Sequence, residues 1–124
     1  MKRELLTYTT SAGGAAIVTG LAVAARLYAI EYLPGTTDTG ATVTITCEGD
    51  RSKPLLTLAT AGTSNLLLYP RDLVHAVANG AALTGTAGGD RTCPLMYGKP
   101  KVVISAGGNV ASGSVVMYYE LDGE

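Results

Sequence analysis

ATVTITCE at residues 41–48 is the clearest strand signal in the chain. In an extended chain Ala41, Val43, Ile45 and Cys47 point to one side, and the threonines between them point to the other. β-branched residues fill this stretch, and they suit a pleated surface of which one face is buried. The stretch therefore predicts a β-strand that contributes one face to a core, and it sets the expectation for the rest of the chain.

Similar runs lie on both sides of this strand. RLYAIEYL at 26–33 alternates, which predicts that Tyr28, Ile30 and Tyr32 share one face and that Leu27 lies on the other. Pro34-Gly35 follows and ends the run. The remaining strand-like runs span 3–10, 15–20, 54–60, 66–69, 94–97, 99–107 and 113–121.

Two glycine-rich turns predict hairpins. SAGG at 11–14 joins the first two predicted strands, and GNVAS at 108–112 joins the last two. Seven or eight short strands about ten residues apart, separated by turn signals, are typical of a β-sandwich or jelly roll. We therefore predict one all-β domain over residues 1–124, an antiparallel β-sandwich or jelly roll.

One turn motif occurs twice, as GDRSKPLL at 49–56 and GDRTCPLM at 89–96. Gly and Asp favour a turn, and Pro stands where the next strand starts and no ladder N–H is needed. The apolar pairs at 55–56 and 95–96 are expected to enter the core. Two interpretations stay open: equivalent corners of two Greek-key halves, or chance similarity between turns built from few residue types.

The segment between these motifs is less regular. RDLVHAVANG at 71–80 fits either a short helix, capped by Asp72 and ended by Gly80, or an irregular loop. The glycine-rich stretch at 79–92 predicts a long loop.

Composition limits the classes of function. The 124 residues have a net charge of −1, and only 15% are charged, so the basic surface of a nucleic-acid-binding protein is missing. The apolar run at 15–25 is too short to span a bilayer, and polar residues separate it from Lys2 and Arg3. We expect an unprocessed soluble protein without nucleic-acid or membrane partners. Its neutral surface fits either a subunit of an assembly or a threonine- and glycine-rich soluble domain.

No catalytic or metal-binding pattern stands out. His75 is the single histidine, and no Cys-x-x-Cys pair is present, so Cys47 and Cys93 are expected to be free thiols. The serines lack nucleophile-elbow spacing, and the glycine-rich 86–92 lacks the Lys-Ser/Thr of a phosphate loop. We predict no catalytic residue, no cofactor and no metal, and therefore not an enzyme.

Arginine and tyrosine supply the candidate interface. Arg51, Arg71 and Arg91 each follow an aspartate, which fits either a local turn clamp or an arginine that reaches a partner's carboxylate. Tyr69 precedes Pro70-Arg71, and Tyr and Arg are enriched at interface hot spots. The candidate interface residues are Tyr69, Arg71, Arg51 and Arg91.

Several segments carry a resemblance to known proteins. They read RLYAIEYLPG at 26–35, DTGATVTITCEGD at 38–50, AGTSN at 61–65 with YPRDLVH at 69–75, ALTGTAGGDR at 82–91 and KVVISAGGN at 101–109. Over residues 26 to 119 the chain resembles small β-rich proteins encoded in structural-gene regions of tailed bacteriophages and prophages. The resemblance implies a virion structural protein, foremost a capsid cement or decoration subunit.

Partners and location follow from that resemblance. It implies the major capsid protein or other virion subunits as partners, a homo-oligomer with a trimer favoured, and a virion assembled in the bacterial host cytoplasm. A tail, collar or head–tail subunit is the alternative within the virion. A carbohydrate- or peptide-binding module is the alternative of another class. It needs an exposed aromatic platform, whereas the strand pattern places Tyr28, Tyr32, Tyr118 and Tyr119 in the core.

Overall fold

A computed structural model describes residues 1–47, 54–73 and 91–121. These residues contain no helix, so the described part of the chain has none that could cross a membrane. They form eleven strands: β1 (Lys2–Thr9), β2 (Ala16–Thr19), β3 (Val23–Leu33), β4 (Thr42–Cys47), β5 (Leu56–Leu58), β6 (Leu66–Leu68), β7 (Asp72–Leu73), β8 (Arg91–Thr92), β9 (Leu95–Gly98), β10 (Pro100–Ser105) and β11 (Ser112–Leu121). The prediction of an all-β fold is confirmed.

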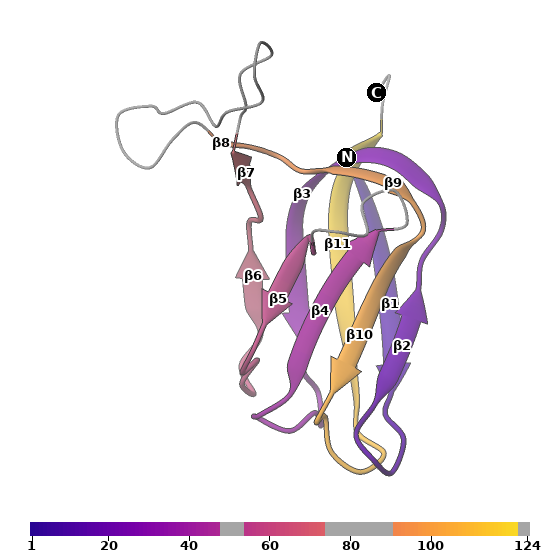
Figure 1. Ribbon diagram of the computed structural model, residues 1–124, viewed down its shortest axis with the longest axis vertical. Helices are drawn as coiled ribbons and strands as arrows, with labels where there is room; N and C mark the ends of the chain where they lie inside the picture. The colour runs from indigo at the N-terminus through magenta and orange to yellow at the C-terminus, as the bar shows by residue number, and fades with distance from the viewer. Residues whose placement is uncertain (48–53, 74–90, 122–124) are drawn as a thin grey trace.

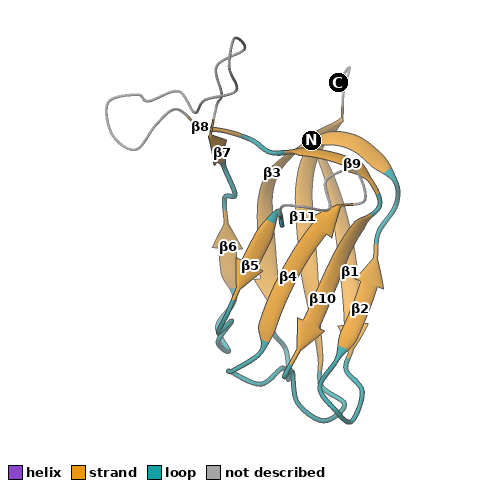
Figure 2. Cartoon of the chain, viewed as in Figure 1, coloured by secondary structure: helices purple, strands orange, loops and turns teal. Residues whose placement is uncertain are grey.

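Two antiparallel sheets pack face to face (Figure 2). The first sheet has the order β1-β11-β3-β6, and β9 pairs with the other part of β3. The second sheet has the order β2-β10-β4-β5. β7 and β8 form a separate two-residue ladder at the upper end of the molecule (Figure 1).

The pairings reveal how the chain is wound. β1 pairs with β11, β2 with β10, β3 with β6 and β4 with β5, so eight strands nest as one long antiparallel hairpin. Rolling up this hairpin brings β11 beside β3 and β10 beside β4. This is the jelly-roll form of the β-sandwich, and its eight strands agree with the predicted number. β7, β8 and β9 are additions within the connection from β6 to β10.

The two predicted hairpins are wrong. β1 and β2 lie in different sheets, and so do β10 and β11. Both connections therefore cross from one sheet to the other. The crossing segments bond to each other instead: Gly107 N–H donates to the Gly14 carbonyl at 2.9 Å, and Thr10 N–H donates to the Ala111 carbonyl at 2.7 Å. The reason is burial: consecutive strands each carry an apolar face, and opposite sheets let both faces reach the same core.

The repeated GDR motif lies only partly within the described residues. Residues 49–53 of the first copy and 89–90 of the second lie outside the described residues, so the Greek-key interpretation stays a prediction. Of the apolar pairs, 55–56 is half-buried and Met96 is fully buried, but Leu95 is 50% exposed. The prediction for Leu95 is wrong, because β9 is a strand whose alternate residues face out.

Most of the segment predicted as a helix or a loop also lies outside the described residues. Its start is β7, a strand of Asp72–Leu73 that pairs with β8. Residues 74–80, with His75, and the rest of the predicted loop up to 90 are not part of the description.

A β-bulge changes the predicted faces of β3. Leu27 is the register partner of Tyr119, and Ala29 is the partner of Tyr118, so Tyr28 is an extra residue. Leu27 is therefore buried together with Ile30, while Tyr28 turns outward. The predicted alternation from 26 to 33 is wrong at Leu27 and Tyr28, because one inserted residue exchanges the two faces of the strand.

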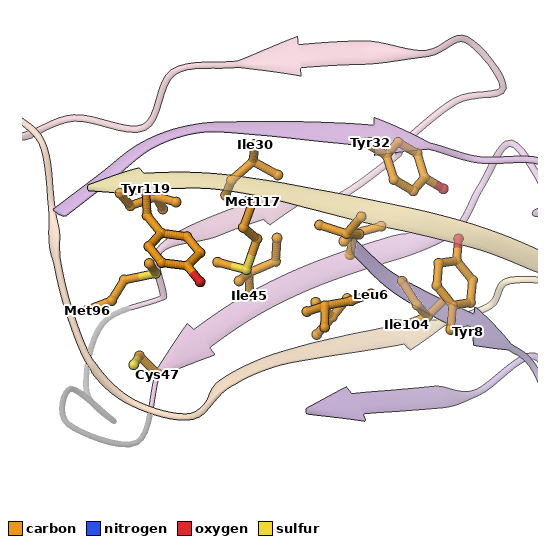
Figure 3. Close-up of a cluster of buried hydrophobic side chains, with 14 of the residues drawn as sticks. Leu6, Tyr8, Ile30, Tyr32, Ile45, Cys47, Met96, Ile104, Met117 and Tyr119 are labelled. Atoms are coloured by element: carbon orange, nitrogen blue, oxygen red, sulfur yellow. The ribbon is translucent and has the colours of Figure 1, made fainter. Parts of the chain in front are cut away.

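One hydrophobic cluster fills the space between the sheets (Figure 3). β4 contributes to it as predicted: Val43, Ile45 and Cys47 are buried, and the intervening threonines are half-buried on the outer side. The other large members are Leu6, Tyr8, Leu27, Ile30, Tyr32, Met96, Val102, Ile104, Val115, Met117 and Tyr119. The jelly roll thus has a core to which both sheets contribute.

Two buried tyrosines at one end of this core have different environments (Figure 3). The Tyr8 hydroxyl is hydrogen-bonded to Thr37 Oγ1 at 2.7 Å. The Tyr32 hydroxyl is buried and has no hydrogen-bond partner. Burial raises the pKa of Tyr32 above its ordinary value, and the neighbouring Tyr8 hydroxyl acts in the same direction.

We predict opposite effects when each hydroxyl is removed. Tyr32→Phe leaves the free energy of unfolding unchanged or raises it by up to about 1 kcal/mol, because it removes an unsatisfied polar atom. Tyr8→Phe lowers it by about 1 to 2 kcal/mol, because the Thr37 hydroxyl loses its partner. Urea unfolding at pH 7, followed by circular dichroism, measures both. A larger loss for Tyr32→Phe than for Tyr8→Phe would contradict this account.

The same pair of proteins tests the raised pKa. Folded Tyr32 keeps its proton above pH 10, whereas in the unfolded chain it ionises near its ordinary pKa of 10.0. The folded state then binds more protons, so the free energy of unfolding falls as the pH rises through about 10. This part of the decline is expected to be absent from Tyr32→Phe.

Candidate functional site

The two outer faces of the sandwich differ in character. The second sheet presents mainly hydroxyl and β-branched side chains, with one outer row formed by the register partners Ile17, Val103, Thr44 and Thr57. The corresponding row of the first sheet joins Leu5, Val116, Glu31 and Leu67. The outer face of the first sheet is therefore the more apolar of the two.

Aromatic side chains lie beside that apolar row. The next row along the strands joins Arg3, Tyr118 and Ala29, with the bulged Tyr28 beside Ala29. Tyr28 and Tyr69 are 43% and 53% exposed. We call the outward side chains of β1, β11, β3 and β6, together with Tyr28 and Tyr69, the tyrosine face.

A hollow of about 200 Å³ opens on the tyrosine face. The small Ala29 lines it and is itself buried beneath larger side chains, and the Glu31 carboxylate accepts a hydrogen bond from the Tyr118 hydroxyl at 3.2 Å. The full lining is Met1, Tyr28, Ala29, Glu31, Leu67, Tyr69 and Tyr118. The hollow therefore combines aromatic rings with a carboxylate.

Arg71 holds two of these tyrosines in place. Its guanidinium carbon lies 5.3 Å from the centre of the Tyr28 ring and 5.8 Å from that of Tyr69. The two rings meet edge to face with their centres 6.0 Å apart. Arg71 Nη1 also donates to the backbone carbonyls of Tyr28 at 2.8 Å and Pro70 at 2.6 Å. Arg71 thus connects residues 69–71, which follow β6, to β3 through hydrogen bonds and cation–π contacts.

The structure brings together two of the four predicted interface residues. Tyr69 and Arg71 share the cluster just described, and Arg71 clamps backbone carbonyls and rings. Arg51 lies outside the described residues. Arg91 is in β8, but its side chain is not part of the description. For all four residues the interface assignment stays a prediction.

The sequence pattern missed the tyrosines on β3 and β11. Of the four tyrosines predicted in the core, Tyr32 and Tyr119 are buried, whereas Tyr28 is exposed and Tyr118 is half-buried on the outer side. Strict alternation predicts that Tyr28 points inward, because a bulge leaves no sign in the sequence pattern. Tyr118 follows Met117 and precedes Tyr119, so an apolar run gave no sign of which residue faces out.

Other features of the described residues point to no chemistry. No three His, Cys, Asp or Glu side chains among them are close enough to hold a metal ion. Both cysteines are free thiols, with Cys47 buried and Cys93 half-buried. A second, wider hollow of about 430 Å³ is lined by Thr7, Leu33, Gly35, Asn65, Ser112, Gly113 and Ser114.

Comparison with known proteins leaves the site to be judged on its own geometry. No protein-family model, curated protein sequence or solved structure matches the chain.

We predict that the Arg71 clamp is measurable as stability. Arg71→Ala lowers the free energy of unfolding by about 1 kcal/mol, because hydrogen bonds and cation–π contacts are lost. Arg26→Ala, which removes an exposed arginine of β3, is the matched control and changes it by less than about 0.5 kcal/mol. Urea unfolding of both variants provides the comparison. Equal effects would show that Arg71 has no clamping role.

Proposed function

We propose that this protein is a structural subunit of a tailed-phage virion, foremost a capsid cement or decoration protein that acts without catalysis. The observation that carries the proposal is the tyrosine face, on which the described side chains of Leu5, Tyr28, Leu67 and Tyr69 are between 43% and 54% exposed. Monomeric proteins seldom expose such patches unless a partner binds there. The jelly-roll topology, the low charge and the resemblance to phage structural proteins support the same role.

The mechanism of such a subunit is mechanical. Covering half-exposed side chains such as Tyr28, Leu67 and Tyr69 yields about 25 cal/mol per Å² of apolar area, before the costs of association. Contacts of this kind among decoration subunits and the major capsid protein would hold the shell against the pressure of the packaged genome. A tail, collar or head–tail position uses the same chemistry in fewer copies.

Quantitative mass spectrometry of purified virions from the phage or induced prophage that encodes the chain tests this proposal. We expect a copy number comparable with that of the major capsid protein. One or a few copies per particle would exclude the cement role and leave the tail, collar or head–tail position. Absence of the chain from the particle would refute a structural role altogether.

A carbohydrate-binding module is a second candidate, and the outward position of Tyr28 favours it. With Tyr69 and Tyr118 beside it, this residue supplies the aromatic rings on which sugars stack, and the Glu31 carboxylate can accept hydroxyl hydrogen bonds. The carbohydrate-binding module is the weaker candidate, because few polar groups line the hollow and sugar sites need several placed hydrogen-bonding groups.

A glycan array with the purified chain, followed by calorimetry of any hit, decides this second candidate. If it is right, Tyr28→Ala weakens binding by at least tenfold, which corresponds to about 1.4 kcal/mol. Ile17→Ala, on the outer face of the second sheet, is the control and leaves binding unchanged. An array without hits rules the module out for the glycans printed on it.

A further inference from the structure

We propose that the tyrosine face pairs with the same face of a second copy of this chain, and that Arg3 of each copy enters the hollow of the other. The proposal names the partner of the surface on which the proposed function rests. Its arguments are the register of three strands, the chemistry of the hollow and the arrangement of charges.

The register gives the first argument. β11 lies between β1 and β3, and Arg3 of β1 and Ala29 of β3 are both register partners of Tyr118. The two neighbours lie at similar distances on either side of β11, about 4.8 Å away. A two-fold axis that runs along β11, above the face, therefore places Arg3 of one copy over Ala29 of the other.

The hollow around Ala29 suits an arginine. The hollow of about 200 Å³ lies among Tyr28, Tyr118 and Leu67, above the buried Ala29, and it can take an incoming aliphatic stem. Glu31 in the lining offers a carboxylate, and guanidinium groups bind carboxylates and stack on aromatic rings. Arg71 does not line the hollow.

The charges of the face are self-complementary under this symmetry. Arg3 and Glu31 lie on opposite sides of β11, one row apart. The same axis places each Glu31 over Leu5 of the other copy, next to its Arg3, so two equivalent ion pairs form across the interface. Arg26 and Glu120, at the end of the face, are register partners within each copy.

Size and shape agree with an isologous sheet-to-sheet contact. The face is about 19 Å wide and 27 Å long on ordinary strand spacings, of the order of 500 Å² in projection. Two such faces amount to about 1,000 Å² in total, which is at the lower bound for a specific protein–protein interface. Sheets pack about 10 Å apart with interdigitating side chains, a gap that an extended arginine spans. The symmetry is two-fold, in contrast to the trimer that the resemblance implies.

Charge exchange in the full-length purified chain tests the pairing. Sedimentation velocity over a range of concentrations is expected to show a dimer of twice 12.6 kDa. Arg3→Glu and Glu31→Arg each weaken the dimer about 30-fold or more, because like charges then meet twice. The double variant Arg3→Glu/Glu31→Arg restores dimerisation to within a few-fold of wild type, since the pairs re-form with exchanged signs. Circular dichroism confirms that each variant is folded.

Ile17→Asp, on the outer face of the second sheet, is the control and leaves the dimer unchanged; Ile17 is 64% exposed. A monomer at every concentration, a trimer, or a double variant as weak as either single one overturns the proposal. So does a wild-type monomer that associates only with capsid subunits or glycans. A dimer that is absent from virions would leave this inference intact and remove the proposed function, whereas a monomer abundant in virions would do the reverse.

Discussion

The structure depends on one constraint: both sheets must cover the same core. Every long strand has an apolar side, and in a chain without Phe or Trp this core is assembled from many aliphatic side chains and a few tyrosines. β1 pairs with β11 and β2 pairs with β10, and the resulting long hairpin is rolled up. In this arrangement the apolar sides of all the long strands face the same core. The hydrogen bond from the Gly107 N–H to the Gly14 carbonyl continues this pairing where the chain passes from one sheet to the other. The jelly-roll winding is thus the arrangement in which hydrogen bonding and burial agree.

Much of this fold could be predicted from local pattern. The alternation in 41–48 gave the strand and its buried side, because Val43 and Ile45 lie in a regular ladder with nothing inserted. Strand positions elsewhere followed from β-branched runs and glycine turns. Sheet membership could not be predicted, because a glycine-rich turn such as SAGG shows where the chain reverses but carries no signal for the sheet it enters next.

The candidate site was harder to predict than the fold, for one physical reason. A bulge shifts the faces of a strand by one residue, and it arises from the fit of β3 to β11 rather than from any residue type. Strict alternation therefore predicts a buried Tyr28 and an exposed Leu27, whereas in the structure Tyr28 is exposed and Leu27 is buried. Tyr69 and Arg71 were found because their residue types are those of interfaces, which required no knowledge of register. Their contact with Tyr28 is tertiary and lies 41 to 43 residues away along the chain.

The bulge also links the core to the surface. By inserting one residue, β3 keeps Leu27 and Ile30 in the core, while Tyr28 is exposed and Glu31 is half-buried on the outer side. Without the insertion, continued alternation from Leu27 would have turned Ala29 and Glu31 toward the core and Ile30 away from it, which places a carboxylate in an apolar core at high cost. A single inserted residue therefore creates the hollow, with a methyl group among aromatic rings and a carboxylate beside them. Because bulges disturb the ladder that contains them, one in a central strand is better explained by what it presents than by what it contributes to packing.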